Sequence, residues 1–205
     1  GDFEGIELVG NTIYASRSKG KIYAITNFEA ATPTIESYET ALNKESDVEG
    51  LGYDAKRNAL LLTCKGATTS DIFKRSVYGF DLKTKQLSAA PLFEISLEAI
   101  RAYLKTNDLE SDESFKKFLG EGLTEFAFGP SAIATHPKTG DYYILSSIGK
   151  TLMVVSSEGK ILYFEKLNKA IHTQPEGITF DTDGTMYISN EGKKSTGKIL
   201  RFAEK

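Results

Sequence analysis

The sequence predicts an all-β fold, a β-propeller, from a repeated motif and the strands that follow each copy. The copies read Asp2-Phe3-Glu4-Gly5-Ile6, Asp47-Val48-Glu49-Gly50-Leu51 and Gln174-Pro175-Glu176-Gly177-Ile178, with a degenerate copy at Pro130-Ser131-Ala132-Ile133. Glu4 and Glu49 lie 45 residues apart, and the degenerate copy lies about 45 residues before the last one. A repeat of this length that is built from short strands is typical of propeller blades.

Each repeat continues from the motif through a turn into further short strands. The turns are rich in Gly, Asn, Asp and Pro, and the strands are rich in β-branched, aromatic and aliphatic residues. Second strands are expected at 12–16, 59–63, 142–146 and 185–189; third strands at 21–26, 77–81, 151–156 and 198–202; fourth strands at 35–38, 86–91 and 160–166. The sequence therefore predicts four visible blades of three or four antiparallel strands.

One insertion, at about 96–119, interrupts the repeat. Leu97, Ile100, Ala102 and Leu104 recur at roughly helical spacing after Ser96, a residue type that caps helices. A second short helix is expected to start at Ser111 or Asp112 and to end near Gly120. We expect these helices to cap one end of the propeller, with a lid over the site as the alternative.

The number of blades in the complete protein is expected to exceed the four that are visible. The last repeat has no fourth strand, and closed propellers commonly complete a blade with a strand from the other terminus. We therefore expect residues 1–205 to form a single propeller domain that lacks an N-terminal blade, out of five in total. A targeting segment is expected upstream as well.

Composition excludes several classes of protein. The 205 residues carry a net charge of −3 with both signs interspersed, so no broad basic face for nucleic acid is expected. The single cysteine, Cys64, excludes an internal disulfide, and its apolar neighbours predict a buried, unreactive thiol. No apolar run is long enough to span a bilayer. We expect a monomer.

The repeated glutamates are the first candidates for a functional site. If Glu4, Glu49 and Glu176 each begin the innermost strand of a blade, their carboxylates converge at the mouth of the central channel. Carboxylates that lie this close together raise one another's pKa or require a cation. Ca²⁺ and Mg²⁺ both prefer such oxygen ligands. Asn190 is a further candidate ligand. The alternative is that each glutamate ties one blade to the next, and Ser131, at the glutamate position of the third copy, lowers the charge of the ring.

The ends of the second strands lie near the same mouth and supply the candidate ligand-binding residues. These are Arg17, Lys65, Ser146 and Glu191, together with Ser131 from the degenerate motif. Arg17 and Lys65 would neutralise the glutamates and leave a polar network without an ion, or they would help to form a mixed-charge pocket for a polar ligand. The two histidines, His136 and His172, lack a recognisable nucleophile and acid, so no hydrolytic triad is predicted.

The motif copies, together with residues 174–191, resemble the SdiA-regulated propeller family of bacteria. Those residues read Gln-Pro-Glu-Gly-Ile-Thr-Phe-Asp-Thr-Asp-Gly-Thr-Met-Tyr-Ile-Ser-Asn-Glu. The resemblance implies a five-bladed, periplasmic or other cell-envelope protein. Similarity to sugar-lactonase propellers implies that Glu4, Glu176 and Asn190 are candidate metal ligands.

The sequence leaves three functions open. The first is an envelope propeller that binds a small ligand or a protein partner, with a divalent cation at the channel mouth. The second is a metal-dependent hydrolase of the lactonase or phosphoesterase type, in which the ion activates water. The third is a purely structural interaction module. Whether the protein is an enzyme stays undecided, with the binding function preferred.

Overall fold

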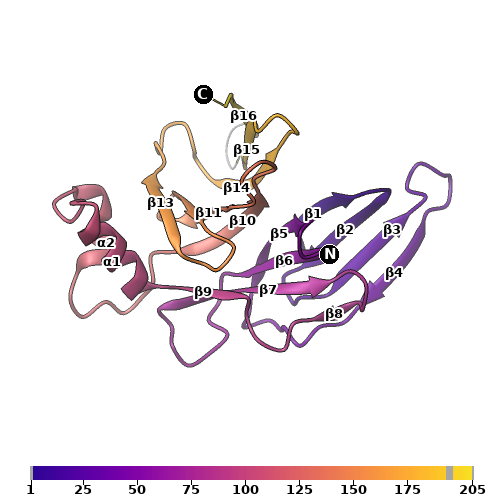
Figure 1. The fold of residues 1–205 in the computed structure, drawn as a ribbon, viewed down its shortest axis with the longest axis horizontal. Helices are drawn as coiled ribbons and strands as arrows, with labels where there is room; N and C mark the ends of the chain where they lie inside the picture. Colours follow the sequence, from indigo (N-terminus) through magenta and orange to yellow (C-terminus); the bar gives the residue numbers. More distant parts are fainter. Residues whose placement is uncertain (1, 193–195, 205) are drawn as a thin grey trace.

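The computed structural model describes residues 2–192 and 196–204, and these form four antiparallel sheets in chain order (Figure 1). Blade 1 contains β1 (Phe3–Val9), β2 (Thr12–Arg17), β3 (Ile22–Thr26) and β4 (Thr34–Tyr38). Blade 2 contains β5 (Val48–Asp54), β6 (Ala59–Cys64), β7 (Lys74–Asp81), β8 (Gln86–Leu87) and β9 (Phe93–Ser96). Blade 3 contains β10 (Gly129–Thr135), β11 (Tyr142–Ile148), β12 (Thr151–Val155) and β13 (Ile161–Lys166). Blade 4 contains β14 (Pro175–Phe180), β15 (Met186–Asn190) and β16 (Lys198–Phe202). The predicted four-bladed propeller is confirmed.

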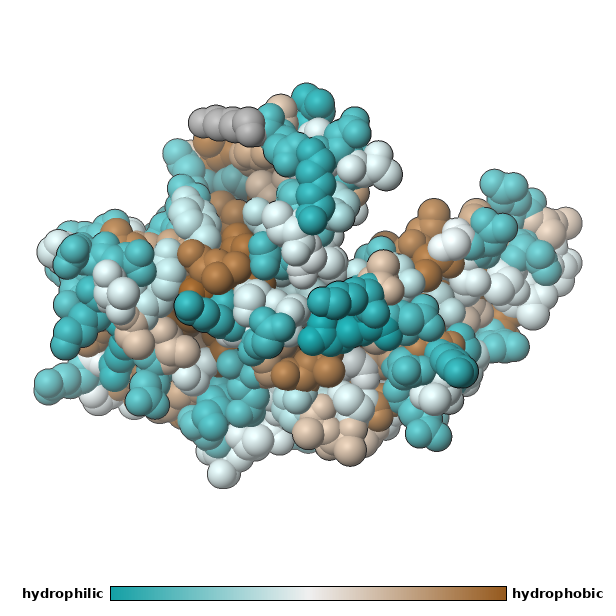
Figure 2. All heavy atoms as spheres, viewed as in Figure 1, coloured by the Kyte–Doolittle hydropathy of each residue, from teal (hydrophilic) through white to brown (hydrophobic). Residues whose placement is uncertain are grey.

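The motif strands form the inner line of the propeller. Strand β1 packs against β5, β5 against β10, and β10 against β14. Within the described ranges, no contact of similar extent joins β1 to β14, and blades 1 and 4 lie at the two ends of an arc (Figure 1). Figure 2 shows apolar side chains at the surface of the arm that blade 1 forms. Ile6 of β1 is 71% exposed and Ile199 of β16 is 75% exposed.

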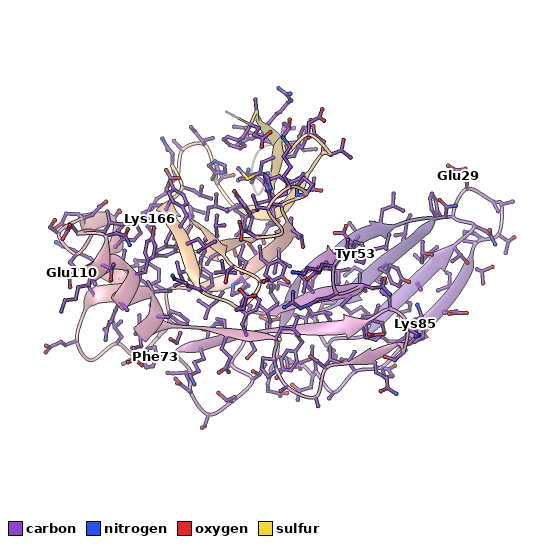
Figure 3. The ribbon with its side chains drawn as sticks, in the orientation of Figure 1. Glu29, Tyr53, Phe73, Lys85, Glu110 and Lys166 are labelled. Carbon is purple, nitrogen blue, oxygen red and sulfur yellow. The ribbon has the colours of Figure 1, made fainter. Side chains whose placement is uncertain are left out.

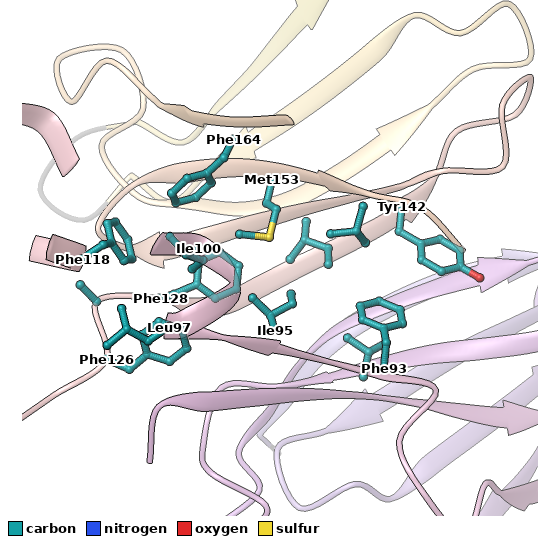
Figure 4. Packing of buried hydrophobic residues seen from close by; sticks show 14 of the residues in the cluster. Phe93, Ile95, Leu97, Ile100, Phe118, Phe126, Phe128, Tyr142, Met153 and Phe164 are labelled. Atoms are coloured by element: carbon teal, nitrogen blue, oxygen red, sulfur yellow. The ribbon is translucent and has the colours of Figure 1, made fainter. Parts of the chain in front are cut away.

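Three hydrophobic clusters fill the three interfaces between neighbouring blades. One joins blades 1 and 2 through residues such as Ile22 and Leu60, and the smallest joins blades 3 and 4 around Leu145 and Ile188. The largest joins blades 2 and 3 and extends into the helical insertion, as the packing of Phe93, Phe128 and Phe164 shows (Figure 4). Most of the apolar surface is therefore buried at the interfaces between blades rather than within one sheet.

The insertion folds as the sequence predicts. It contains α1 (Leu97–Thr106), the 3₁₀ turn η1 (Glu113–Phe115) and α2 (Lys116–Leu119). The Ala99 backbone N–H donates to the Ser96 side chain over 3.0 Å, so Ser96 is the N-cap. The apolar faces of these helices pack onto the outer part of blade 3, near β13. The insertion therefore widens the core at the rim of the propeller. No membrane-spanning helix is found among the residues that the structure describes.

The outer edge of blade 2 differs from the expected strand at 86–91. Only β8 forms there, and a second short strand, β9, pairs with the beginning of β7. Strand β7 is longer than expected, so two short strands share its edge. Pro91 lies between them, and proline has no N–H to donate to a sheet.

Candidate functional site

Each motif glutamate is the extra residue of a β-bulge. The register between the first two strands of a blade skips one residue at Glu4, at Glu49 and at Glu176. The same irregularity occurs at Ser131 in blade 3. A bulge leaves its extra residue outside the regular pairing and redirects its side chain. The fold thus gives all four motif positions the same special geometry.

The glycine after each glutamate permits a close approach between the strands. A Cβ on Gly50 would lie 2.3 Å from the Thr63 hydroxyl oxygen and 3.1 Å from the backbone of Ala132 in the next blade. The Gly50 N–H donates to that hydroxyl over 3.0 Å. The glutamate and the glycine therefore recur as neighbours in the motif, because the bulge that redirects the glutamate needs a glycine beside it.

A cavity of about 520 Å³ at this end of the inner strands brings most of the predicted residues together. It is lined by Glu4, Glu49, Lys65, Ser131, Glu176, Asn190 and Glu191, and also by Phe3, Gln174 and Ser189. We call it the mouth cavity. Of the predicted residues, only Arg17 and Ser146 do not line it. The sequence missed Gln174, although its place directly before the last Pro-Glu-Gly was a usable signal.

Lys65 and Glu49, both of blade 2, form an ion pair in the mouth cavity. The Lys65 ammonium donates to Glu49 over 2.6 Å. Burial acts to lower the pKa of Lys65, but the bond to Glu49 and the charges of Glu49, Asp47 and Glu176 outweigh burial and raise it. Of the motif glutamates that Lys65 was expected to neutralise, Glu49 is thus the one with which it forms an ion pair.

Two other carboxyl groups of the cavity have raised pKa values, so their charged forms are disfavoured. Burial, a hydrogen bond with Asp2 and the charge of Glu49 raise the pKa of Glu4 to about 6. Burial is also the largest cause that raises the pKa of Glu176, with Glu49 adding to it while Gln174 and Lys65 oppose it. Both groups would gain from a cationic or hydrogen-donating partner, which is the usual signature of a binding site.

The amide groups of the cavity have unused hydrogen-bonding capacity. Asn190, the last residue of β15, is only 4% exposed, and neither its amide oxygen nor its amide nitrogen has a partner in the described part of the chain. The side-chain oxygen of Gln174 is likewise buried without a partner. A buried polar group without a hydrogen bond costs about 1–3 kcal/mol. A ligand that pairs with Asn190 would recover that cost.

Three predicted residues have contacts that connect the scaffold. The Ser131 hydroxyl donates to the Pro175 carbonyl over 2.8 Å and so ties blade 3 to blade 4. The Ser146 hydroxyl accepts from the Gly129 N–H over 2.9 Å and donates to the Ile148 carbonyl. The backbone N–H of Arg17 closes the turn between β2 and β3.

Among residues 2–192 and 196–204, no group of three or more His, Cys, Asp or Glu side chains is placed to hold a metal ion, so Ca²⁺ or Mg²⁺ stays a prediction.

His172 is buried against Phe202 and does not line the mouth cavity. The Nδ1 atom of His136 accepts two backbone N–H groups in a turn. Burial raises the pKa of Cys64 to about 12, as expected for an unreactive thiol.

A second cavity of about 610 Å³ lies where the turns between first and second strands meet. Beside it, the Tyr142 hydroxyl donates to Asp54 over 2.5 Å, and Arg57 donates to Asp54 over 2.9 Å and to Tyr142 over 2.7 Å. Burial acts to raise the pKa of Asp54, but these hydrogen bonds lower it. This network joins blades 2 and 3, and it was not predictable from the sequence, since Tyr142 lies 85 residues from Arg57 and 88 residues from Asp54.

Comparison with solved structures shows the fold. A Bacteroides thetaiotaomicron protein of unknown function matches with a TM-score of 0.59 and 13% identity, over 95% of this chain and 44% of its own. A nidogen/laminin complex chain matches with a TM-score of 0.54 and 16% identity, over 97% and 60%. Virginiamycin B lyase from Staphylococcus aureus matches with a TM-score of 0.51 and 14% identity, over 99% and 56%. The chain thus spans about half the length of these structures.

Comparison with protein families is more specific. No curated protein matches this chain. The model of the SdiA-regulated family matches residues 1–194, which include all four motif copies and every residue of the mouth cavity. The resemblance drawn from the Glu-Gly motifs is therefore confirmed, and the chain belongs to the SdiA-regulated family.

Proposed function

We propose that this propeller binds a small hydroxylated amine, such as an amino sugar, in its mouth cavity. The observation that carries the proposal is the buried amide of Asn190, which has no partner among the described residues and lies beside two carboxylates whose pKa values are raised by burial. An amide offers one acceptor and two donors, so it pairs well with hydroxyl groups. A ligand that supplies both kinds of partner satisfies Asn190 and the carboxylates together.

Charge determines the kind of ligand. Four glutamates line the cavity against one lysine, and that lysine is paired with Glu49. Glu4, Glu176 and Glu191 therefore leave the cavity acidic, and an ammonium group is its natural counterion. The volume of about 520 Å³ suits a ligand the size of a sugar rather than a single ion.

Two alternative functions use the same residues: a structural cation site and a metal-dependent hydrolase. A metal-dependent hydrolase needs one ion held by Glu4, Glu49, Glu176 and Asn190 with a coordination position open to substrate. Calcium would then stabilise the protein without any amine. The structural interaction module would respond to neither.

The location that goes with this function is the cell envelope, in the periplasm. Its support is the resemblance to the envelope propellers of the SdiA-regulated family. Fractionation of cells that express the tagged full-length protein tests it: we expect the tag in the periplasmic fraction, and recovery in the cytosol contradicts the location but not the binding site.

Glucosamine binding, measured by calorimetry and by thermal melting, tests the function. We expect glucosamine to raise the melting temperature, because a ligand that binds only the folded state must stabilise it. Glu176→Gln should weaken binding about tenfold or more, a loss of ~1.4 kcal/mol or more. The matched control, Glu29→Gln, removes the same charge at the tip of blade 1 (Figure 3) and should leave the affinity unchanged.

Three further results test amine binding against the alternative functions. Glucose in place of glucosamine should bind more weakly, since it lacks the ammonium group. A melting temperature that rises with calcium alone, and no longer rises in Glu176→Gln, favours the metal site. No response to glucosamine at millimolar concentration contradicts the proposed function.

A further inference from the structure

The second cavity, of about 610 Å³, lies at the other end of the inner strands from the mouth cavity. The inner strands of all four blades form its walls: β1 supplies Glu7, β5 supplies Tyr53, β10 supplies Thr135 and β14 supplies Phe180. Of the described residues, none lines both cavities. A ligand of the second cavity therefore needs no residue of the mouth cavity, and the volume suits a small organic molecule.

Two aromatic residues of this wall are held in place by contacts. The Tyr53 hydroxyl donates to the Asn58 side-chain oxygen over 3.3 Å, and the Thr135 hydroxyl donates to the Tyr53 carbonyl over 2.7 Å. Figure 3 shows Tyr53 near the middle of the molecule, where the arm of blade 1 meets the other blades. The Phe180 ring meets the His136 ring edge-on, with 4.9 Å between their centres. Both aromatic side chains are therefore in position before a ligand arrives.

Glu7 lines the same cavity without a partner. It is half-buried, and no hydrogen bond or ion pair joins its carboxyl group to another described residue. Burial raises its pKa to about 7 and is the one cause of this shift. The titratable groups of β2 and β5, the strands that pack against β1, do not contribute to it: Tyr14, Arg17, Glu49, Tyr53 and Asp54. A cationic ligand would supply the charge partner that Glu7 lacks.

The unpaired charge of the second cavity is mainly acidic. Of the charged side chains in its wall, Arg57 is paired with Asp54 and Lys138 is paired with Glu204. In the described part of the chain, no ion pair is found for the others, which are the acidic Glu7, Asp141 and Glu158 and the basic Lys56. This balance favours a cation over an anion as the ligand.

We propose that the second cavity binds a quaternary ammonium compound, a small organic cation whose nitrogen carries methyl groups. The faces of aromatic rings attract such a cation, and its methyl groups pack against them. The Glu7 carboxylate supplies the counter-charge. A quaternary nitrogen has no N–H to donate, so it suits a wall of aromatic rings better than the mouth cavity, where amide and carboxylate oxygens accept hydrogen bonds. The proposal does not depend on what the mouth cavity binds.

Titration with choline at pH 8, followed by calorimetry, tests the proposal. The neutral analogue of choline, in which a carbon atom replaces the nitrogen, has the same shape without the charge and should bind about tenfold more weakly or less. Glu7→Gln should weaken choline binding about tenfold or more. The matched control, Glu29→Gln, removes an exposed carboxylate at the tip of blade 1 and should leave the affinity unchanged.

The aromatic wall is tested separately at Phe180. Phe180→Leu keeps an apolar side chain but removes the ring, and should weaken choline binding several-fold. Phe180→Tyr keeps the ring and should retain the affinity. Melting temperatures of both variants show whether they fold, and the Glu7 variant and the neutral analogue do not depend on this position.

The pH dependence of binding identifies the carboxylate. Choline has a permanent charge, so a change of affinity with pH reports a group of the protein. Because the ionised form of Glu7 is the one that pairs with a cation, affinity at pH 8 should exceed affinity at pH 6 by about fivefold or more, and Glu7→Gln should abolish the difference.

Three results would overturn the proposal. The first is the absence of heat with millimolar choline. The second is equal affinity for choline and its neutral analogue. The third is binding that Glu176→Gln weakens and Glu7→Gln does not, since choline would then occupy the mouth cavity.

Discussion

The two interior blades and the two terminal blades have similar strands but very different burial. Every residue of β6 and of β12 is buried, whereas β2, the counterpart of β6 in blade 1, is only half buried and β16, the counterpart of β12 in blade 4, is largely exposed. The interior blades have a neighbour on each face, and the terminal blades have one. The difference shows that a blade of this propeller is stabilised mainly by the blades beside it, as in other repeat proteins.

The charged groups differ in the same way. In blade 2, Glu49 pairs with Lys65, and Asp54 is bound by Tyr142 and Arg57. In blade 1, burial alone raises the pKa of Glu7 to about 7, and burial is the first cause of the raised pKa of Glu4. Inner carboxylates thus have cationic partners where blades meet on both sides, whereas among the described residues no ion pair is found for Glu4 or Glu7 at the end of the arc.

The largest expected effect is the loss of an apolar side chain between blades 2 and 3. Leu61 is fully buried in the cluster that joins them, so Leu61→Ala should lower the free energy of unfolding by about 2–5 kcal/mol through lost burial and a cavity. Urea denaturation measures it. Ile199→Ala, at an exposed position of blade 4, is the control and should change stability by less than about 0.5 kcal/mol. Equal losses would contradict the contrast between interior and terminal blades.

A smaller effect is expected for the polar link between the interior blades. Tyr142→Phe removes the hydroxyl that donates to Asp54 and accepts from Arg57, and should cost about 1.5–3 kcal/mol, the range for a hydrogen bond to a charged group. Chemical denaturation at neutral pH checks this value. Tyr163→Phe removes a hydroxyl from the exposed side of β13 and should cost much less. If both variants lose the same stability, the network does not join the blades.

The smallest expected effect is a pH dependence that originates in blade 1. Because the pKa of Glu7 is raised from 4.5 to about 7 in the folded state, the folded protein binds this proton more tightly than the unfolded chain does. This contribution to stability is present below pH 4.5 and is lost as the pH rises through 7. Melting temperatures between pH 4.5 and 8 should therefore show a decline that Glu7→Gln reduces, while Glu29→Gln retains it. An unchanged decline in Glu7→Gln would place its origin elsewhere.

Much of the fold followed from local pattern. The Glu-Gly repeat predicted the inner strands, and turn residues placed the second and third strands within a few positions of their observed bounds. Ser96 was predicted to cap the first helix and Ser111 or Asp112 to begin the second, and the observed caps are Ser96 and Asp112. These features depend on neighbouring residues in the chain, which is why they were predictable. Strand β9 was not, because its pairing depends on the unusual length of β7.

The mouth cavity was predictable to a similar degree. The repeat placed Glu4, Glu49 and Glu176 at equivalent positions, and equivalent positions of adjacent blades meet around one axis, as the shared cavity shows. The bulge that redirects each glutamate was not predictable, because a bulge is a property of the register between two strands. Arg17 satisfied the same reasoning and yet does not line the cavity.

By itself, the sequence determined the repeat, the blade elements, the acidic character of the mouth and the place of the helical insertion, since each is written in the order and spacing of residues along the chain. Only the tertiary structure decided which groups have partners. It paired Glu49 with Lys65, left the Asn190 amide without a partner among the described residues, and joined Asp54 to Tyr142. The physical reason is distance: hydrogen bonds and charges act over a few ångströms between segments far apart in the chain, and folding alone sets those separations.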